Sequence, residues 1–154
     1  MQRSPCSKTV CRRYLHFVMN ETLLQAYGET DYLVCLDAAT WACIRINQRL
    51  PESLQLEVGT RSWGFITAWN PHSKAGTSAD NHVAQRALLV ALQALPESVI
   101  LSAIGIGNSG WHEPSLFVIG PDQSTLDALA HRHQQNAYVY GQGSETAHLR
   151  VLSP

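Results

Sequence analysis

Residues 107–114, "GNSGWHEP", join two apolar runs, "SVILSAIGIG" at 98–107 and "PSLFVIG" at 114–120. Both runs are short, apolar and bounded by turn residues, which is typical of buried strands. The connection is long enough for a hairpin but too short for the helical crossover that joins parallel strands. This segment therefore predicts two antiparallel strands that are neighbours in a sheet.

The periodic segments on either side of this hairpin complete a regular order. A strand and a helix precede it, "SWGFITAW" at 62–69 and "TSADNHVAQRALLVALQAL" at 77–95, and a helix and a strand follow it, "PDQSTLDALAHRH" at 121–133 and "NAYVYG" at 136–141. The order β-α-β-β-α-β predicts an α+β fold with a ferredoxin-like core over residues 62–141. A doubly wound parallel sheet is the less favoured alternative.

The two core helices carry their own signals. Thr77 and Asp80 fit a capping box at the start of the first helix. The residues expected to face the core are Val83, Ala87, Leu88, Ala91, Leu92 and Leu95 in the first helix, and Leu126, Leu129 and Ala130 in the second.

The chain outside this core predicts additions to the same domain. Residues 20–30 predict a short helix that begins at Asn20 and stops at Gly28, and residues 31–47 predict a hairpin at one edge of the sheet. Residues 48–61 have little period of their own and are expected to be a connection. "AHLRVL" at 147–152 predicts one more strand. We expect residues 1–154 to form one domain.

Composition restricts the classes of partner. Charged residues make up 15% of the chain and the net charge is -1, which does not favour nucleic acid or an anionic membrane. Residues 1–19 contain four basic residues and no acidic one, and we expect a flexible basic leader there. The four cysteines form no CxxC pair, and no segment resembles a signal peptide or a membrane span. A cytoplasmic protein is expected.

The predicted strand directions bring the polar residues of the second half to one edge of the sheet. The first two core strands end at the edge where the last two begin. "TAWNP" at 67–71, the hairpin connection, the residues before the last strand and the start of the first helix should meet there. The candidate ligand-binding residues are Trp69, Asn70, Ser73, Lys74, Asn81, Trp111, Ser115, Gln135 and Asn136, and the candidate catalytic residue is Glu113.

These residue types suit a small anionic or nucleotide-like ligand. A helix N-terminus and Lys74 would attract phosphate, amides would bind a base edge, and the indoles of Trp69 and Trp111 would stack on a ring. If the protein is an enzyme, Glu113 is the carboxylate expected to act as a general base or metal ligand. "GIGNSG" at 105–110 has dinucleotide-type spacing but leads into a strand instead of a helix. No metal site is predicted, and the sequence does not identify a cofactor.

Two other interpretations stay open. The same edge, or a sheet face bearing Tyr138 and Tyr140, could bind a protein or a nucleic-acid strand without catalysis, although the acidic core disfavours nucleic acid. The polar residues could also only bond to one another as a structural network. The sequence leaves open whether the protein is an enzyme.

The same motifs resemble a bacterial family catalogued as domain of unknown function 3293. The resemblance rests on "ITAWNPHS" at 66–73, "WHEPSLFVIG" at 111–120, "QNAYVYG" at 135–141, and Asn81 and Arg86 between them. It implies a small protein with no assigned activity. The family places a Phe and a Gly where this chain has His133 and Gln134. We expect His133 to fill the aromatic position, half buried, while Gln134 makes the expected helix stop doubtful.

Overall fold

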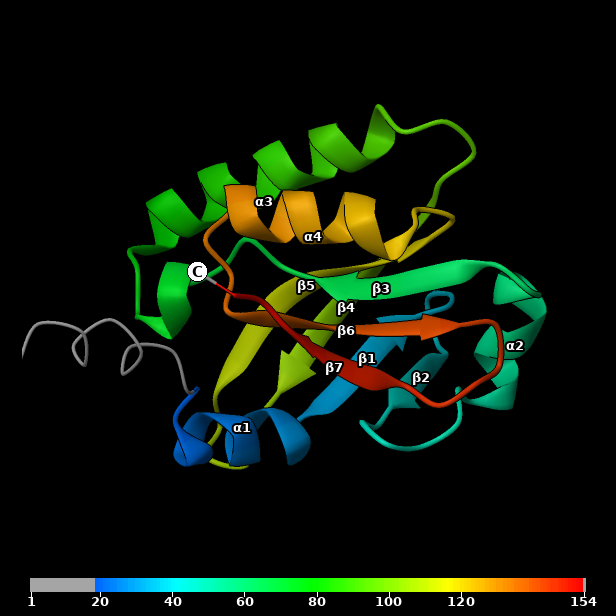
Figure 1. Ribbon diagram of the computed structural model, residues 1–154, viewed down its shortest axis with the longest axis horizontal. Coiled ribbons are helices and arrows are strands. Elements are labelled where there is room, and N and C mark those ends of the chain that lie inside the picture. Colours follow the sequence, from blue (N-terminus) through cyan, green and yellow to red (C-terminus); the bar gives the residue numbers. More distant parts are fainter. Residues whose placement is uncertain (1–18, 154) are drawn as a thin grey trace, which may run out of the picture.

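The computed structural model describes residues 19–153, and over this range four α-helices, a short 3₁₀ turn and seven strands follow one another (Figure 1). The predicted leader, except for Met19, lies outside the described residues. The elements in chain order are α1 Glu21–Gly28, β1 Asp31–Cys35, β2 Trp41–Ile44, α2 Glu52–Val58, β3 Ser62–Ile66, η1 Pro71–Ser73, α3 Ser78–Gln93, β4 Val99–Ile106, β5 His112–Ile119, α4 Gln123–Arg132, β6 Ala137–Gln142 and β7 His148–Val151.

The described strands form a single sheet in the order β2-β1-β4-β5-β3-β6-β7, and every neighbouring pair is antiparallel. The α+β class and the hairpin between β4 and β5 are confirmed, and the parallel alternative is excluded. The sheet is larger than the predicted core. The β1-β2 hairpin extends it beyond β4, as expected, and β7 extends it beyond β6.

Helices α3 and α4 cover one face of this sheet (Figure 1). They bury leucines such as Leu88, Leu92 and Leu126 against Ile66 and Val118. Thr77 accepts a hydrogen bond from the backbone N–H of Asp80 at 3.1 Å, so the predicted cap of α3 is present. This layer holds the ends of β3 and β6 in fixed positions.

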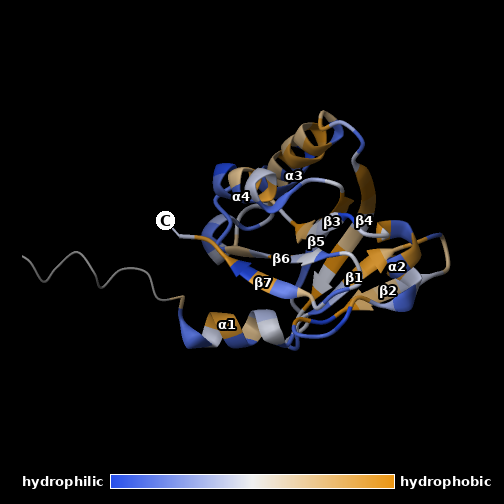
Figure 2. Cartoon of the chain, turned by 45° about the vertical axis from the view of Figure 1, so that its right-hand side comes forward, coloured by the Kyte–Doolittle hydropathy of each residue, from blue (hydrophilic) through white to orange (hydrophobic). Residues whose placement is uncertain are grey.

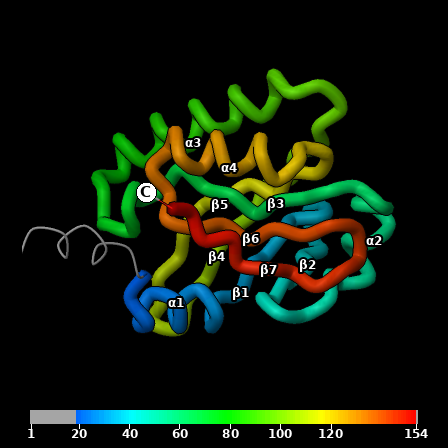
Figure 3. The backbone as a smooth tube through the Cα atoms, viewed as in Figure 1, coloured from blue at the N-terminus to red at the C-terminus, as the bar shows by residue number. Residues whose placement is uncertain are grey.

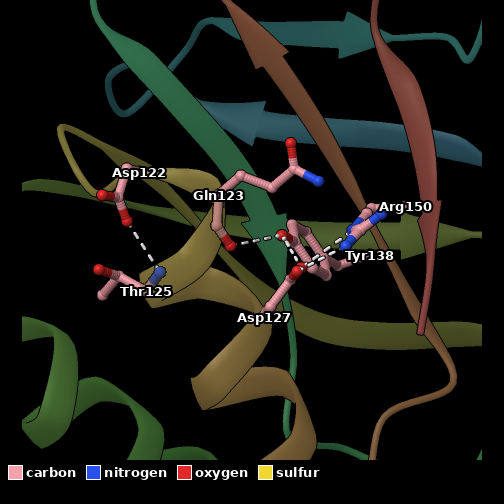
Figure 4. A network of polar contacts seen from close by, with 6 residues as sticks. All are labelled: Asp122, Gln123, Thr125, Asp127, Tyr138 and Arg150. Carbon is pink, nitrogen blue, oxygen red and sulfur yellow. Dashed lines mark hydrogen bonds and ion pairs between the residues drawn. The ribbon is translucent and has the colours of Figure 1, made fainter. Parts of the chain in front are cut away.

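The polar network in Figure 4 fastens α4 to the neighbouring strands. Tyr138, only 3% exposed, donates from its hydroxyl to Asp127 Oδ1 at 2.7 Å. The Arg150 guanidinium binds both oxygens of the same carboxylate, at 3.1 and 2.7 Å. Tyr138 therefore lies beneath α4, and the expected aromatic sheet face is not exposed at this position.

The other face of the sheet is concave and holds a second core. Trp63, Phe65 and Phe117 line it, and Leu54 and Val58 of α2 pack into it. Trp63 lies directly against Gly141, where an added Cβ would come within 2.3 Å of the indole. Only glycine at this position lets the large indole fill the concave side.

The curvature brings the two ends of the sheet together, along the chain path drawn in Figure 3. The segment after β2 pairs with the segment before β7. The backbone N–H of Asn47 donates to Ala147 O, and the N–H of Ala147 donates to Gln48 O, both at 2.9 Å. This contact satisfies edge groups that would otherwise be left for pairing with another chain.

Two expectations about helices were wrong. Residues 48–61, expected to be a connection, contain α2, whose buried residues Leu54 and Val58 are spaced by four; Leu50, buried just before the helix, continues the same spacing. In α3, Val83 is 72% exposed and Ala87 is also exposed. The other predicted core positions of α3 are confirmed, since Leu88 and Leu92 are buried and Ala91 and Leu95 pack against the core. Apolar residues also occur on the outer side of this helix, which Figure 2 colours by hydropathy, and this is why sequence period alone added Val83 and Ala87 to the buried face.

Candidate functional site

A pocket of about 420 Å³ lies under α1, at the edge of the sheet where β3 and β4 end and β5 begins. Helix α2 lies at the opposite end of the molecule (Figure 1). Of the predicted site residues, the fold brings five around this one pocket: Asn70, Ser73, Trp111, Glu113 and Gln135. The other lining residues are Thr22, Leu23, Gln25, Ala26, Tyr27, Glu29, Thr30, Gly107, Asn108 and Ser109.

Helix α1 forms the roof of the pocket. Asn20 caps it by accepting from the N–H of Thr22 at 2.9 Å. None of its eight residues is buried, although Leu23, Ala26 and Tyr27 lie one helical turn apart on the side that lines the pocket. The apolar side of this helix therefore faces a space instead of the packed core.

The C-terminal end of the roof is tied to the rest of the fold. The Tyr32 hydroxyl donates to Tyr27 O at 2.7 Å. Near the end of α1, Glu29 accepts from Asn108 Nδ2 at 2.8 Å, which joins the helix to the β4-β5 connection. These contacts hold α1 over the pocket without filling it.

Glu113 projects from β5 toward the concave side. It pairs with Gly105 of β4, and Gly105 pairs with Tyr32 of β1, so these three residues form one row across the sheet. Burial raises the pKa of Glu113 from 4.5 to about 8, and a hydrogen bond from Asn70 offsets part of the rise. Near neutral pH this carboxyl is mostly protonated and close to its titration point.

The corner "TAWNP" positions Asn70 for this contact. Asn70 has a left-handed backbone, with φ of 49°. Its backbone N–H donates to Asn81 Oδ1 at 2.9 Å, and its own Oδ1 accepts from Asn81 Nδ2 at 2.8 Å and from the N–H of Gly76 at 3.1 Å. With the oxygen so occupied, the amide nitrogen of Asn70 is the atom left for Glu113.

The segment after Asn70 is unusually strained. His72 and Ser73 also adopt positive φ, at 56° and 58°, a conformation that costs a non-glycine residue about 1–2 kcal/mol. Ser73 Oγ accepts from Asn136 Nδ2 at 2.9 Å and lies 3.4 Å from the Tyr27 hydroxyl. Strain of this kind concentrates at functional sites, and here it directs Ser73 toward the pocket.

The other predicted residues lie around the pocket but do not line it. The Trp69 indole packs edge-on against His82, with ring centroids 4.9 Å apart, and only its carbonyl, which accepts from Gln135 Nε2 at 3.2 Å, touches the site. Ser115 is buried and donates to Glu113 O at 3.0 Å. Asn81 and Asn136 support the loop, and Lys74 is exposed outside the lining.

Helix α1 is the part of the site that sequence reasoning missed. Leu23, Ala26, Tyr27 and Thr30 follow the i, i+3, i+4, i+7 pattern of a helix face. Thr30 is followed at once by β1, which is antiparallel to β4 and therefore starts at the same edge of the sheet. The helix-face pattern was present in the sequence, but the pairing of β1 with β4 that places α1 over the predicted edge comes from the structure.

The ionisable groups that line the pocket are acidic. Among residues 19–153, the lining carries the carboxyl groups of Glu29 and Glu113 and no Lys, Arg or His. The same range contains no group of three or more His, Cys, Asp or Glu side chains arranged to hold a metal ion. None of its helices has the length and apolar character required to cross a membrane.

These features define an α+β protein with a roofed pocket at one end of a curled antiparallel sheet. Residues 66–138 match the family model described as "Protein of unknown function (DUF3293)", which confirms the resemblance over just under half of the chain. No curated protein and no solved structure shows a significant match. The matched stretch supplies Asn70, Ser73, Trp111, Glu113 and Gln135, whereas α1 lies outside it.

Proposed function

We propose that the pocket under α1 binds a small molecule and that Glu113 exchanges a proton with it. The observation that carries this proposal is the position of α1, whose apolar side covers a space of about 420 Å³ while none of its residues is buried. A volume of this size is in the range of small-ligand pockets. A helix that packed only for stability would bury that side in the core.

The lining groups suit a molecule with a flat or apolar body and a few polar atoms. Trp111 is 42% exposed, so much of its indole is accessible for contact with a ring. Ser73 and Tyr27 supply hydroxyl groups. Gln135 donates from Nε2 to Trp69 O and His133 O, each at 3.2 Å, which leaves its Oε1 to accept from a ligand.

Catalysis, if the pocket carries it, rests on Glu113. A group that titrates near the working pH is an efficient general acid or base. The pKa of about 8 allows Glu113 to give a proton to a bound molecule and to take one back. We propose proton transfer as the reaction type and assign no bond-breaking step.

Two of the sequence-based expectations receive less support. The predicted anion site at the start of α3 would use Lys74, but Lys74 does not line the pocket. One form of the interaction interpretation used tyrosines on the sheet face, and of these Tyr138 is 3% exposed. A protein or nucleic-acid partner remains the alternative if no small molecule binds.

The free thiols of Cys35 and Cys43 support a reducing compartment such as the cytoplasm.

Thermal unfolding against a panel of small amines, amides, nucleosides and phosphorylated metabolites tests the proposal. A ligand at 100 times its dissociation constant adds about 2.7 kcal/mol and should raise the Tm by about 5–10 °C. The test variant is Ala26→Phe, which fills the pocket from the exposed roof helix.

Ala87→Phe, at an exposed position of α3, is the matched control. We expect the shift to disappear in Ala26→Phe and to persist in Ala87→Phe. A panel without any shift, or a shift that Ala26→Phe retains, would refute the pocket as the site.

For the core we propose a ferredoxin-like arrangement. It is supported by the β-α-β-β-α-β order of residues 62–141 and by the strand order β4-β5-β3-β6 within the larger sheet. Nuclear Overhauser contacts in solution should link β3 to both β5 and β6. Contacts between β3 and β4 as direct neighbours would contradict the arrangement.

A further inference from the structure

We propose that the ligand of this pocket is a small organic cation, with an ammonium, amidinium or guanidinium group on a flat or apolar body. This inference rests on the proposed function and narrows it to one chemical class. Three independent features of the lining lead to it: its charge, the direction of its amide groups, and its aromatic side chains.

The charge of the lining favours a cation. Glu113 faces the pocket from β5 and Glu29 lies at its edge near the end of α1, and the described lining contains no basic side chain. The other titratable groups around Glu113 are the phenols of Tyr27 and Tyr32, which are neutral near pH 7. A ligand with a positive group would supply the missing partner of the Glu113 carboxylate.

The amides of the lining present acceptors. Asn108 Nδ2 donates to Glu29 at 2.8 Å, and Gln135 Nε2 donates to two backbone carbonyls. Asn70 Oδ1 is held by Asn81 and Gly76, and a hydrogen bond from the Asn70 side chain reaches Glu113. These nitrogens already donate within the protein, whereas the oxygens of Asn108 and Gln135 accept no hydrogen bond from the described residues, so a ligand rich in N–H groups complements those oxygens.

Aromatic rings complete the match. Trp111 and Tyr27 both line the pocket. Trp111 belongs to the β4-β5 connection and Tyr27 to the roof helix. A cation near the face of an indole or phenol ring is attracted by the ring quadrupole, more strongly where water is excluded. The same rings contact a flat organic body.

Binding of a cation should be linked to the proton on Glu113. A positive charge beside the carboxylate favours its ionised form, so the cation displaces the proton that Glu113 holds in the empty pocket. Affinity for a cation should therefore rise by up to tenfold per pH unit toward pH 8 and level off above it. A neutral ligand would show no such rise.

The test uses three probes of nearly the same shape: benzamidine as the cation, benzamide as the neutral molecule and benzoate as the anion. Small amines and guanidines extend the cation set. Isothermal titration calorimetry of the full chain at pH 8.5 gives each affinity, and repetition at pH 7 in buffers of different ionisation enthalpy counts the protons released. We expect benzamidine to bind most tightly, with release of protons at pH 7.

Variants assign the effect to named groups. Glu113→Gln should weaken benzamidine binding by about 10- to 100-fold, the loss of one charged hydrogen-bond partner, and leave benzamide within about threefold. Trp111→Leu should weaken the cation by about threefold or more. Glu57→Gln, an exposed carboxylate on α2, is the matched control and should change neither affinity.

The outcomes separate the two proposals. If benzamide or benzoate binds as tightly as benzamidine and Ala26→Phe abolishes that binding, the pocket function stands and the cation inference is refuted. Absence of binding by every cation also refutes the inference. If no molecule of any class binds in an Ala26-dependent manner, the proposed function fails as well.

Discussion

Gln134 shows how a single backbone conformation connects a helix end to the site. Its φ is 55°, the left-handed geometry for which the resembled family uses glycine. Its N–H donates to His131 O at 3.0 Å, and its carbonyl accepts from the N–H of His72 at 2.8 Å. Glutamine thus takes the position that was expected to need glycine, and it links the end of α4 to the strained segment 70–73.

We expect Gln134→Gly to stabilise the protein by about 0.5–1 kcal/mol. Removing the side chain relieves about 1–2 kcal/mol of left-handed strain, of which the greater chain entropy of glycine in the unfolded state takes back about 0.5–1 kcal/mol. Urea unfolding measures the change. Ala128→Gly, exposed within α4 where the backbone is helical, is the control and should cost about 1 kcal/mol. A loss of stability in Gln134→Gly would mean that the side chain makes a contact of its own.

At the scale of elements, Asp127 joins α4 to β6 and β7. We expect Asp127→Ala to cost about 1–3 kcal/mol, because the buried Tyr138 hydroxyl loses its charged acceptor and keeps only Gln123 O at 3.3 Å. Arg150→Ala should cost less, about 0.5–1 kcal/mol, because this pair is partly exposed. A double-mutant cycle by chemical denaturation gives the coupling, expected at about 0.5–1 kcal/mol. Equal costs for the two single variants would contradict this order.

Helix α1 should be the least stable helix of the described chain. None of its residues is buried, whereas the similarly short α4 buries Leu126, Leu129 and Ala130, and local opening is easiest where few apolar groups are buried. In native-state hydrogen exchange, we expect α1 amides to exchange well before those of α4 and β5. A molecule bound in the pocket should slow exchange in α1 specifically. Protection of α1 equal to that of α4 without ligand would contradict its role as a loosely held roof.

At the scale of the whole molecule, the sequence predicted the helices and strands better than the way the curled sheet and α1 surround the pocket. Strand directions followed from the short connection at 107–114, and these directions alone placed Asn70, Glu113 and Gln135 at one edge of the sheet. The curvature was not predicted, and the close packing of Trp63 against Gly141 on the concave side is a contact between distant segments that no local pattern contains. The sequence also could not show which side chains at this edge face the pocket. Trp69 was expected to stack on a ligand, yet its indole packs against His82.

The pH dependence of global stability tests the state of Glu113 in the intact fold. Its pKa is about 8 when folded against 4.5 ordinarily, so between these values the folded chain holds a proton that the unfolded chain has released. The free energy of unfolding should therefore fall as pH rises through this range and become level above pH 8. A fully buried group would change the free energy of unfolding by about 1.4 kcal/mol for each unit of its pKa shift. Because Glu113 keeps some exposure to solvent, we expect a smaller total change of about 2–3 kcal/mol.

The informative part of this range is pH 6.5 to 8.5. Burial lowers the pKa of His133 from 6.5. Below about pH 6.5 the unfolded chain therefore takes up a proton on this histidine that the folded chain does not, so stability rises with pH there, opposite to the effect of Glu113. Partial burial of Tyr27 and full burial of Tyr32 raise the pKa values of both phenols above 10, so they contribute only in more alkaline solution. Urea unfolding at half-unit intervals should show stability falling in the wild type and nearly level in Glu113→Gln, which becomes the more stable chain at pH 8.5. A fall that persists in Glu113→Gln would assign the proton to another group and remove the physical basis for Glu113 as an acid or base.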